Sequence, residues 1–160
     1  MTLIRDFVPA DGEAAAAIKN HYILHTAANF GETAVTAADF ADGIAAARAR
    51  HGRALVAEAE GRILGFAAAD RFRTHSANRL AELSIYLTPG ATGKGVGREL
   101  LDHLIRQLRA DGFYAGLIAV ITADNEGSLQ FHRRAGFADA GSWRKAAYKF
   151  GRWHDVAVLE

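Results

Sequence analysis

Two segments of different hydrophobic periodicity meet at a glycine-rich turn, Thr92-Gly93-Lys94-Gly95-Val96-Gly97-Arg98. Before the turn, residues 80–87 alternate between two faces, which predicts a strand. After it, apolar residues recur at helical spacing as far as residue 110, which predicts an amphipathic helix. Glycines allow close approach of the backbone to a ligand, and the N-terminus of the helix favours an anion. Lys94 and Arg98 add positive charge, so the turn predicts a site for a diphosphate.

Two familiar phosphate-binding motifs do not match this turn. The nucleotide P-loop has a Ser or Thr directly after its Gly-Lys pair, whereas Gly95 follows Lys94 here. The dinucleotide fingerprint requires a Gly or Ala three residues beyond its second glycine, and Leu100 occupies that position after Gly97. The sequence therefore disfavours a nucleotide-hydrolysing enzyme. On spacing alone, a glycine-rich loop without a ligand remains an alternative.

Strand-like and helix-like segments alternate along the rest of the chain. Asp11 is a candidate N-cap, and Thr36 with Asp39 forms a capping-box pair that predicts a helix ending at Gly52. Glu60-Gly61 predicts a hairpin turn. The alternation predicts an α/β (α+β) protein. Strands are predicted over residues 3–8, 53–58, 62–69, 80–87, 117–121, 137–149 and 154–159, and helices over residues 13–28, 96–110 and 125–135.

The composition limits the class of protein. The chain has 160 residues, of which 50% are hydrophobic, enough for one core and too few for two ordinary domains. Lys and Arg number 19 against 18 Asp and Glu, so a nucleic-acid partner is not favoured. The absence of cysteine excludes disulfides, thiolate metal sites and a cysteine nucleophile. With no signal-peptide pattern and no membrane-length apolar run, the sequence predicts a single cytoplasmic domain over residues 1–160, without a membrane partner.

A pair of histidines on the first predicted helix raises the question of a metal. His21 and His25 are four residues apart and would share one face. Tyr22 replaces the glutamate of a zinc-protease motif, so the spacing alone is weak. We favour packing and hydrogen bonding for both residues and expect no metal.

The glycine-rich turn resembles the pyrophosphate loop of the GNAT acetyltransferase superfamily, Gln/Arg-x-x-Gly-x-Gly/Ala, with Thr92 in place of the usual Gln or Arg. The stretch from Asn125 and Ser128 to Gly136-Phe137 resembles a second segment of that superfamily. The resemblance implies the GNAT fold, which is a central mixed, mostly antiparallel sheet flanked by helices. It also implies that acetyl-CoA binds at Ile85, Tyr86, Leu87, Gly93, Lys94, Gly95, Val96, Gly97, Arg98, Asn125 and Ser128.

A narrower resemblance runs along nearly the whole chain. The segments that carry it are similar to phosphinothricin acetyltransferases, a branch that includes acetyltransferases for methionine sulfoximine and methionine sulfone. The resemblance implies transfer of acetyl to the amine of a small amino-acid-like substrate by direct attack. It also implies a homodimer, with the C-terminal hairpin in the interface. The segments are Asn20-His21-Tyr22-Ile23, Asn29-Phe30 with Glu32, Ala81-Glu82 with Tyr86, and Gly151-Arg152-Trp153-His154-Asp155-Val156.

The same branch implies roles for individual residues. Glu82 matches its general base, and His132 matches a residue that acts as acid or relay for the departing thiolate. Without the resemblance, Glu82 would be a solvent-facing residue and His132 an ordinary surface histidine. Trp143 and Trp153 are predicted to anchor the core or an interface. Acceptor-binding residues are implied in a closing loop and in a basic loop over residues 71–79, namely Phe30, Glu32, Arg71, Phe72 and Arg73.

Two alternatives remain open. The acceptor amine could belong to an aminoglycoside, a polyamine or a protein N-terminus. A non-enzymatic alternative is a sensor that binds coenzyme A without catalysis, but the presence of both Glu82 and His132 argues against lost activity.

Overall fold

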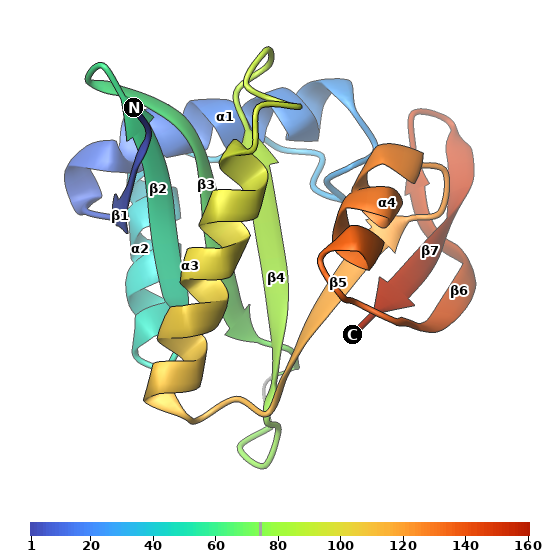
Figure 1. The fold of residues 1–160 in the computed structure, drawn as a ribbon. Coiled ribbons are helices and arrows are strands. Elements are labelled where there is room, and N and C mark those ends of the chain that lie inside the picture. Colours follow the sequence, from blue (N-terminus) through green and yellow to red (C-terminus); the bar gives the residue numbers. More distant parts are fainter. Residues whose placement is uncertain (74) are drawn as a thin grey trace.

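The structure is a computed structural model that describes residues 1–73 and 75–160. Its strands form a single sheet with helices on both faces (Figure 1). The strands are β1 (Leu3–Asp6), β2 (Arg53–Ala59), β3 (Arg62–Arg71), β4 (Leu80–Leu87), β5 (Gly116–Thr122), β6 (Asp139–Lys149) and β7 (Arg152–Leu159). The helices are the short 3-10 helix η1 (Pro9–Asp11), α1 (Gly12–His25), α2 (Ala37–Arg48), α3 (Val96–Asp111) and α4 (Glu126–Arg134).

The sheet has the strand order β1-β2-β3-β4-β5-β7-β6. The pair β4–β5 is parallel and the other neighbouring strands are antiparallel, so the predicted mixed, mostly antiparallel sheet is confirmed. Helices α1 and α2 pack on one face of β3, and α3 packs on the other face over β2, β3 and β4 (Figure 1). Helix α4 packs against β5.

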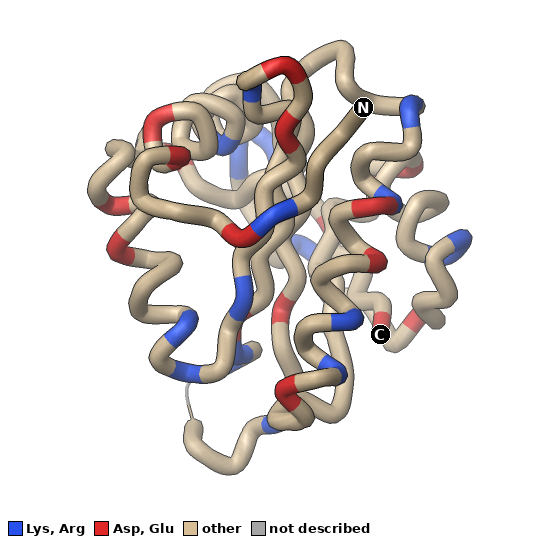
Figure 2. The backbone as a smooth tube through the Cα atoms, turned by 60° about the vertical axis from the view of Figure 1, so that its left-hand side comes forward, with Lys and Arg blue, Asp and Glu red and all other residues tan. Residues whose placement is uncertain are grey.

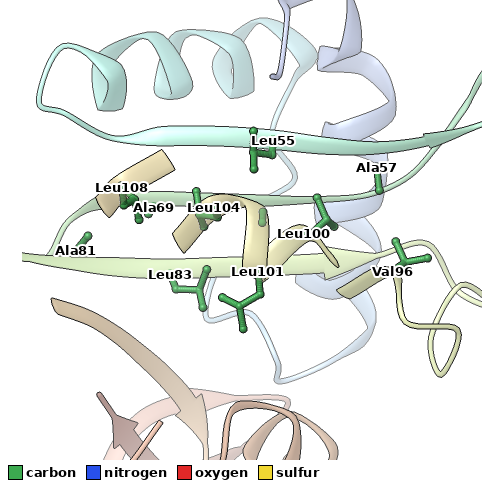
Figure 3. Close-up of a cluster of buried hydrophobic side chains, with 11 residues drawn as sticks. Leu55, Ala57, Ala69, Ala81, Leu83, Val96, Leu100, Leu101, Leu104 and Leu108 are labelled. Carbon is green, nitrogen blue, oxygen red and sulfur yellow. The ribbon is translucent and has the colours of Figure 1, made fainter. Parts of the chain in front are cut away.

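Helix α3 supplies the centre of the main core. Its Leu100, Leu101 and Leu104 are fully buried at 0% exposure. They face small and aliphatic side chains of β2, β3 and β4, including Leu55 and Ala69 (Figure 3). The apolar spacing of α3 therefore fixes the helix on the sheet, directly after the glycine-rich turn.

The sheet separates between β4 and β5. Their parallel pairing is confined to residues 80–82 and 116–118. From Ala119 onward, β5 pairs with β7 instead, and Figure 1 shows β4 and β5 diverging beyond that point. An opening in the sheet therefore begins immediately after Glu82.

Most predicted elements are confirmed, and the differences lie at the ends of helices and strands: β1 ends at Asp6 rather than at residue 8, and β7 begins at Arg152 rather than at residue 154. Thr36 caps α2 as expected, with its hydroxyl accepting a hydrogen bond from the Asp39 N–H at 3.1 Å. Asp11 does not cap α1 with its side chain, because its carboxylate accepts hydrogen bonds from Arg5 at 2.7 and 2.8 Å. Helix α1 ends at His25, and α2 ends before Gly52 in a turn where His51 is left-handed (φ 68°).

The surface carries both signs of charge. Figure 2 shows acidic segments beside basic ones along the visible backbone, which accords with a net charge of +1. Within the described ranges, no helix is both long and apolar enough to cross a membrane.

Candidate active site

A cavity of about 570 Å³ occupies the opening between β4 and β5. Its walls come from the end of β4, the glycine-rich turn, β5 and α4. Lys94 and Val96 belong to the turn but do not line it, since Lys94 is exposed and Val96 is buried in the core. The predicted cofactor residues that do line it are Ile85, Tyr86, Leu87, Gly93, Gly95, Gly97, Arg98, Asn125 and Ser128.

The glycine-rich turn has a backbone that presents N–H groups to this cavity. Gly93 and Gly95 are left-handed, with φ of 75° and 85°. Gly95 is the N-cap of α3, so the free N–H groups of the first helical turn and the positive end of the helix dipole lie at the cavity wall. The Arg98 guanidinium is held beside them by Asp102 at 2.9 Å. This arrangement can bind an anion such as a diphosphate.

The end of β4 directs backbone groups into the same cavity. The Phe72 N–H donates to the Leu80 carbonyl at 2.9 Å, and the Thr88 N–H donates to the Leu64 carbonyl at 2.8 Å. Because backbone groups alternate in direction along an antiparallel ladder, those of Ile85 and Leu87 point away from β3. The Leu87 carbonyl accepts from the Tyr22 hydroxyl at 2.6 Å. The N–H groups of Ile85 and Leu87 are therefore available to a carbonyl oxygen in the cavity.

His132 lies in the cavity wall with only 3% of its surface exposed, so it is not an ordinary surface histidine. Its Nδ1 is 2.8 Å from the Ser128 carbonyl oxygen. A carbonyl can only accept, so we assign the proton to Nδ1, which leaves Nε2 as the acceptor in the neutral ring. Burial lowers the pKa of His132, although the bond to Ser128 opposes this shift. A neutral His132 is better suited to accept or relay a proton than to supply one.

A second cavity, of about 350 Å³, lies on the face of the sheet covered by α1 and α2. Glu82 and Ser84 of β4 line it, together with Asp70 and Arg71 of β3. Ser84 also lines the first cavity, so the two cavities meet at β4. Two molecules, one in each cavity, could therefore meet at the opening in the sheet that begins after Glu82.

Glu82 has an environment that favours its protonated form. Surrounding protein atoms raise the pKa of its carboxyl, and the negative charge of Asp70 raises that pKa further. Asp70 is the cross-strand partner of Glu82. The side chain nevertheless remains exposed and open to the cavity. A carboxylate with raised proton affinity that is still accessible is suited to general-base chemistry.

The predicted acceptor residues divide into two groups. Arg71 lines the second cavity, and its Nε is buried without a hydrogen-bond partner. Phe30, Glu32, Phe72 and Arg73 line neither cavity. Arg73 is exposed and left-handed (φ 65°), with its guanidinium 5.4 Å from the Phe72 ring. Phe30 and Glu32 lie on the surface of the connection between α1 and α2. Thr74 of the predicted basic loop lies outside the described residues.

Several cavity residues were not predicted from the sequence. Tyr22, Thr92 and Phe131 line the first cavity, and Lys19 lines the second. Tyr22, Thr92 and Phe131 stand inside the segments used for the family resemblance, so these three could have been found. Lys19 has no signal in the local pattern, because its position depends on the packing of α1 against β3.

The exposure of two tryptophans and two histidines bears on what was predicted for them from the sequence. Trp143 and Trp153 are 43% and 57% exposed, so the prediction that they could anchor the core is wrong. His21 and His25 are exposed, with ring centroids 5.4 Å apart. No group of three or more His, Cys, Asp or Glu suited to a metal ion is found in residues 1–73 and 75–160.

The sequence profile described as "Acetyltransferase (GNAT) family" matches residues 17–137. The chain belongs to the GNAT acetyltransferase family. This membership makes the protein an acyltransferase.

Three relatives indicate the branch of the GNAT family. The chain is 36% identical to an L-methionine sulfoximine/L-methionine sulfone acetyltransferase of Pseudomonas paraeruginosa, covering 98% of this chain and 92% of the relative. It is 34% identical to the phosphinothricin N-acetyltransferase of Streptomyces viridochromogenes, covering 98% and 85%. The solved phosphinothricin acetyltransferase of Sinorhizobium meliloti, in complex with acetyl-CoA, is 35% identical with a TM-score of 0.92, covering 99% of this chain and 86% of that one.

Proposed function

We propose that this enzyme transfers acetyl from acetyl-CoA to the amine of a small amino acid of the phosphinothricin, methionine sulfoximine or methionine sulfone type. The observation that carries the proposal is the position of Glu82. It lines one cavity at the point where the neighbouring cavity begins, and its carboxyl has a raised pKa. The names of two relatives, which act on such amino acids, support the acceptor class.

Acetyl-CoA would bind in the cavity between β4 and β5. The residues there fit this molecule, because the turn at Gly93 and Gly95 offers N–H groups to a diphosphate. The strand edge at Ile85 and Leu87 offers backbone groups to the amides of the pantetheine arm. When bound there, acetyl-CoA would supply the activated acetyl group.

Direct attack by the acceptor amine requires that its ammonium lose a proton. Glu82 is the proposed base, since its raised pKa brings it closer to the proton affinity of the amine. The Ile85 and Leu87 N–H groups would stabilise negative charge that develops on the carbonyl oxygen. His132 would act through Nε2 as a relay for a proton near the sulfur, because its Nδ1 proton is held by Ser128.

The acceptor would bind in the cavity between α1, α2 and β3. Arg71 is the proposed partner of the acceptor's carboxylate, because its buried Nε lacks a hydrogen-bond partner in the protein and a guanidinium fork suits a carboxylate. Phe30 and Glu32 would contribute through closure of their loop. Phe72 and Arg73 would contribute through the basic loop that follows Arg71.

We further propose a homodimer in the cytoplasm, where acetyl-CoA is available, with residues 1–160 acting as a single domain. The C-terminal hairpin exposes four large aromatic side chains. Such a concentration of apolar surface is typical of an interface. They are Trp143 (43% exposed), Tyr148 (56%), Phe150 (58%) and Trp153 (57%).

The test is an acceptor screen with acetyl-CoA in which free thiol is measured. Phosphinothricin, methionine sulfoximine and methionine sulfone should be acetylated, and plain methionine should be a poorer acceptor because the partners of the polar tip would be left unpaired. Kanamycin, spermidine and an N-terminal alanine peptide serve as competing acceptors. If one of these is the best acceptor and no amino acid reacts, the alternative acceptor class replaces this proposal.

A further inference from the structure

Lys19 is a cation in the acceptor cavity that the proposed mechanism does not use. It comes from α1, on the face of that helix turned toward the sheet, and its side chain is half-buried. Its Nζ lies 5.8 Å from the centroid of the Phe40 ring. Among the described residues, no carboxylate oxygen lies within 4.0 Å of this ammonium. Burial in this position lowers the pKa of Lys19, as expected for a cation without a paired anion.

The carboxylates of the same cavity have other partners. Asp70 accepts hydrogen bonds from the Arg50 guanidinium at 2.5 and 3.3 Å and from the Arg71 backbone N–H at 2.7 Å. Asp39 accepts from the Thr36 hydroxyl at 2.7 Å and is exposed at the N-terminus of α2, where the helix dipole stabilises its charge. Neither carboxylate neutralises Lys19.

Arg71 is the second cation of the cavity without a paired carboxylate. Its guanidinium lies 5.5 Å from the Phe113 ring and beside the Tyr114 hydroxyl. Lys19 and Arg71 come from different elements, α1 and β3. Two separate cations in one cavity can bind two separate anionic groups of one ligand.

Charge balance then distinguishes the possible acceptors. Asp70 is balanced by Arg50, and Asp39 is exposed to solvent at the N-terminus of α2, where Thr36 and the helix dipole stabilise its charge. The remaining charges facing an acceptor are Lys19, Arg71 and the carboxylate of Glu82. An amino acid with a neutral tip has one ammonium and one carboxylate, and would leave one cation without a partner. An amino acid with an anionic tip provides a partner for each of the three charges, Lys19, Arg71 and Glu82. Unpaired charge in a partly desolvated cavity is costly, so the second kind of ligand is favoured.

We propose that Lys19 is a specificity-determining residue that selects acceptors with a second anionic group, such as the phosphinate of phosphinothricin, over acceptors with a neutral polar tip, such as methionine sulfone. The inference rests on the proposed function, because it assumes that the acceptor amine lies at Glu82. It adds which member of the acceptor class this chain prefers and which residue makes the choice.

The test compares kcat/KM for phosphinothricin and methionine sulfone in the wild type and in Lys19→Met, which keeps the length and packing of the side chain but removes its charge. Phosphinothricin should be the better acceptor of the wild type. Lys19→Met should lower its kcat/KM roughly 10- to 100-fold, the usual range for a lost charge-assisted hydrogen bond. Most of this fall in kcat/KM should come from a rise in KM, because the phosphinate tip does not take part in the reaction. The value for methionine sulfone should change less than about threefold.

Two further variants separate charge from structure. Lys19→Arg should retain most of the preference for phosphinothricin. Arg106→Met removes an exposed cation from α3, which packs on the opposite face of the sheet. This control variant should leave kcat/KM unchanged for both acceptors. An unchanged KM for acetyl-CoA and an unchanged unfolding midpoint would show that Lys19→Met is folded.

The outcomes are distinguishable. If the wild type acetylates both amino acids but Lys19→Met affects both equally, or affects neither, the role of Lys19 is refuted and the proposed function stands. If the wild type prefers methionine sulfone, the charge-balance reasoning is wrong. If the wild type acetylates neither amino acid but acetylates a polyamine, the proposed function fails, and the role of Lys19 fails with it.

Discussion

Replacing Glu82 by Gln removes the proposed general base while keeping the shape of its side chain. A general base typically contributes ~10²–10⁴-fold to the rate, which corresponds to ~3–5 kcal/mol of the barrier at 1.36 kcal/mol per tenfold. The nearest carboxylate along the sheet, Asp70, is held by Arg50 at 2.5 Å, so it is a poor substitute. We therefore expect kcat for the best acceptor to fall by at least about 100-fold in Glu82→Gln.

The stability of Glu82→Gln should move in the opposite direction to its activity. The pKa of Glu82 is raised by partial desolvation against the surrounding protein atoms and by the charge of Asp70, so the folded protein binds this proton more tightly than the unfolded chain does. Stability contributed by the group is therefore present below its unfolded pKa and lost as the pH rises through the folded pKa. At neutral pH the charged carboxylate destabilises the fold, and Glu82→Gln should unfold at an equal or higher denaturant concentration than the wild type. A merely structural Glu82 would give the reverse result.

The assay is release of free thiol from acetyl-CoA at saturating acceptor over a range of pH, with calorimetric titration of coenzyme A as the binding control. In the pH–rate profile, the wild-type rate should fall at low pH as Glu82 is protonated. This fall at low pH should be absent in Glu82→Gln. Asp70→Asn is the matched comparison, because removing that charge should lower the pKa of Glu82 and move the fall in rate to lower pH. Near wild-type turnover of Glu82→Gln at neutral pH would refute the assignment of the base.

Three further predictions concern the cofactor, the core and the assembly. Gly95→Glu should weaken coenzyme A binding in calorimetry, because it puts a bulky anion into a left-handed position of the turn (φ 85°); unchanged affinity would refute the diphosphate site. Leu104→Ala should lower the free energy of unfolding by ~2–5 kcal/mol in urea denaturation, since Leu104 is 0% exposed in the core, and a loss under ~1 kcal/mol would mean that the core closes over the space. Sedimentation should show a dimer at micromolar concentration, and Trp153→Lys, which changes a 57% exposed side chain, should shift it toward monomer; a wild-type monomer would contradict the proposed interface.

The sequence predicted those features that depend on local periodicity. The apolar spacing of α3 and the alternation of β4 each specify an element without reference to distant residues, and both were confirmed. Because residues alternate along β4, Ser84 shares the face of Glu82, and both line the second cavity. The glycine-rich turn was recognisable because the left-handed conformations of Gly93 and Gly95 require that residue type.

Features that depend on tertiary packing were not predictable in this way. The presence of Lys19 in the acceptor cavity results from how α1 crosses β3, and nothing in the apolar pattern of α1 indicates it. The early end of α1 at His25 is similar, because Lys149, from the far end of the chain, donates to the Ile23 and Asn29 carbonyls at 2.6 and 2.7 Å. Trp143 and Trp153 were predicted to anchor the core or an interface, and the sequence could not choose between the two, because an aromatic side chain does not reveal whether its partner is the same chain or another one.

The short ladder between β4 and β5 joins two parts of the sheet. Only residues 80–82 and 116–118 pair between these two parts, so the segment from β5 onward has few backbone hydrogen bonds to the rest. Amide hydrogens of β5 and α4 should then exchange through local openings at a lower free energy than those of β2 and β3. A ligand held between β4 and α4 touches both parts, and its binding free energy opposes their separation. Coenzyme A should therefore slow exchange most strongly in the C-terminal third, including amides that it does not contact.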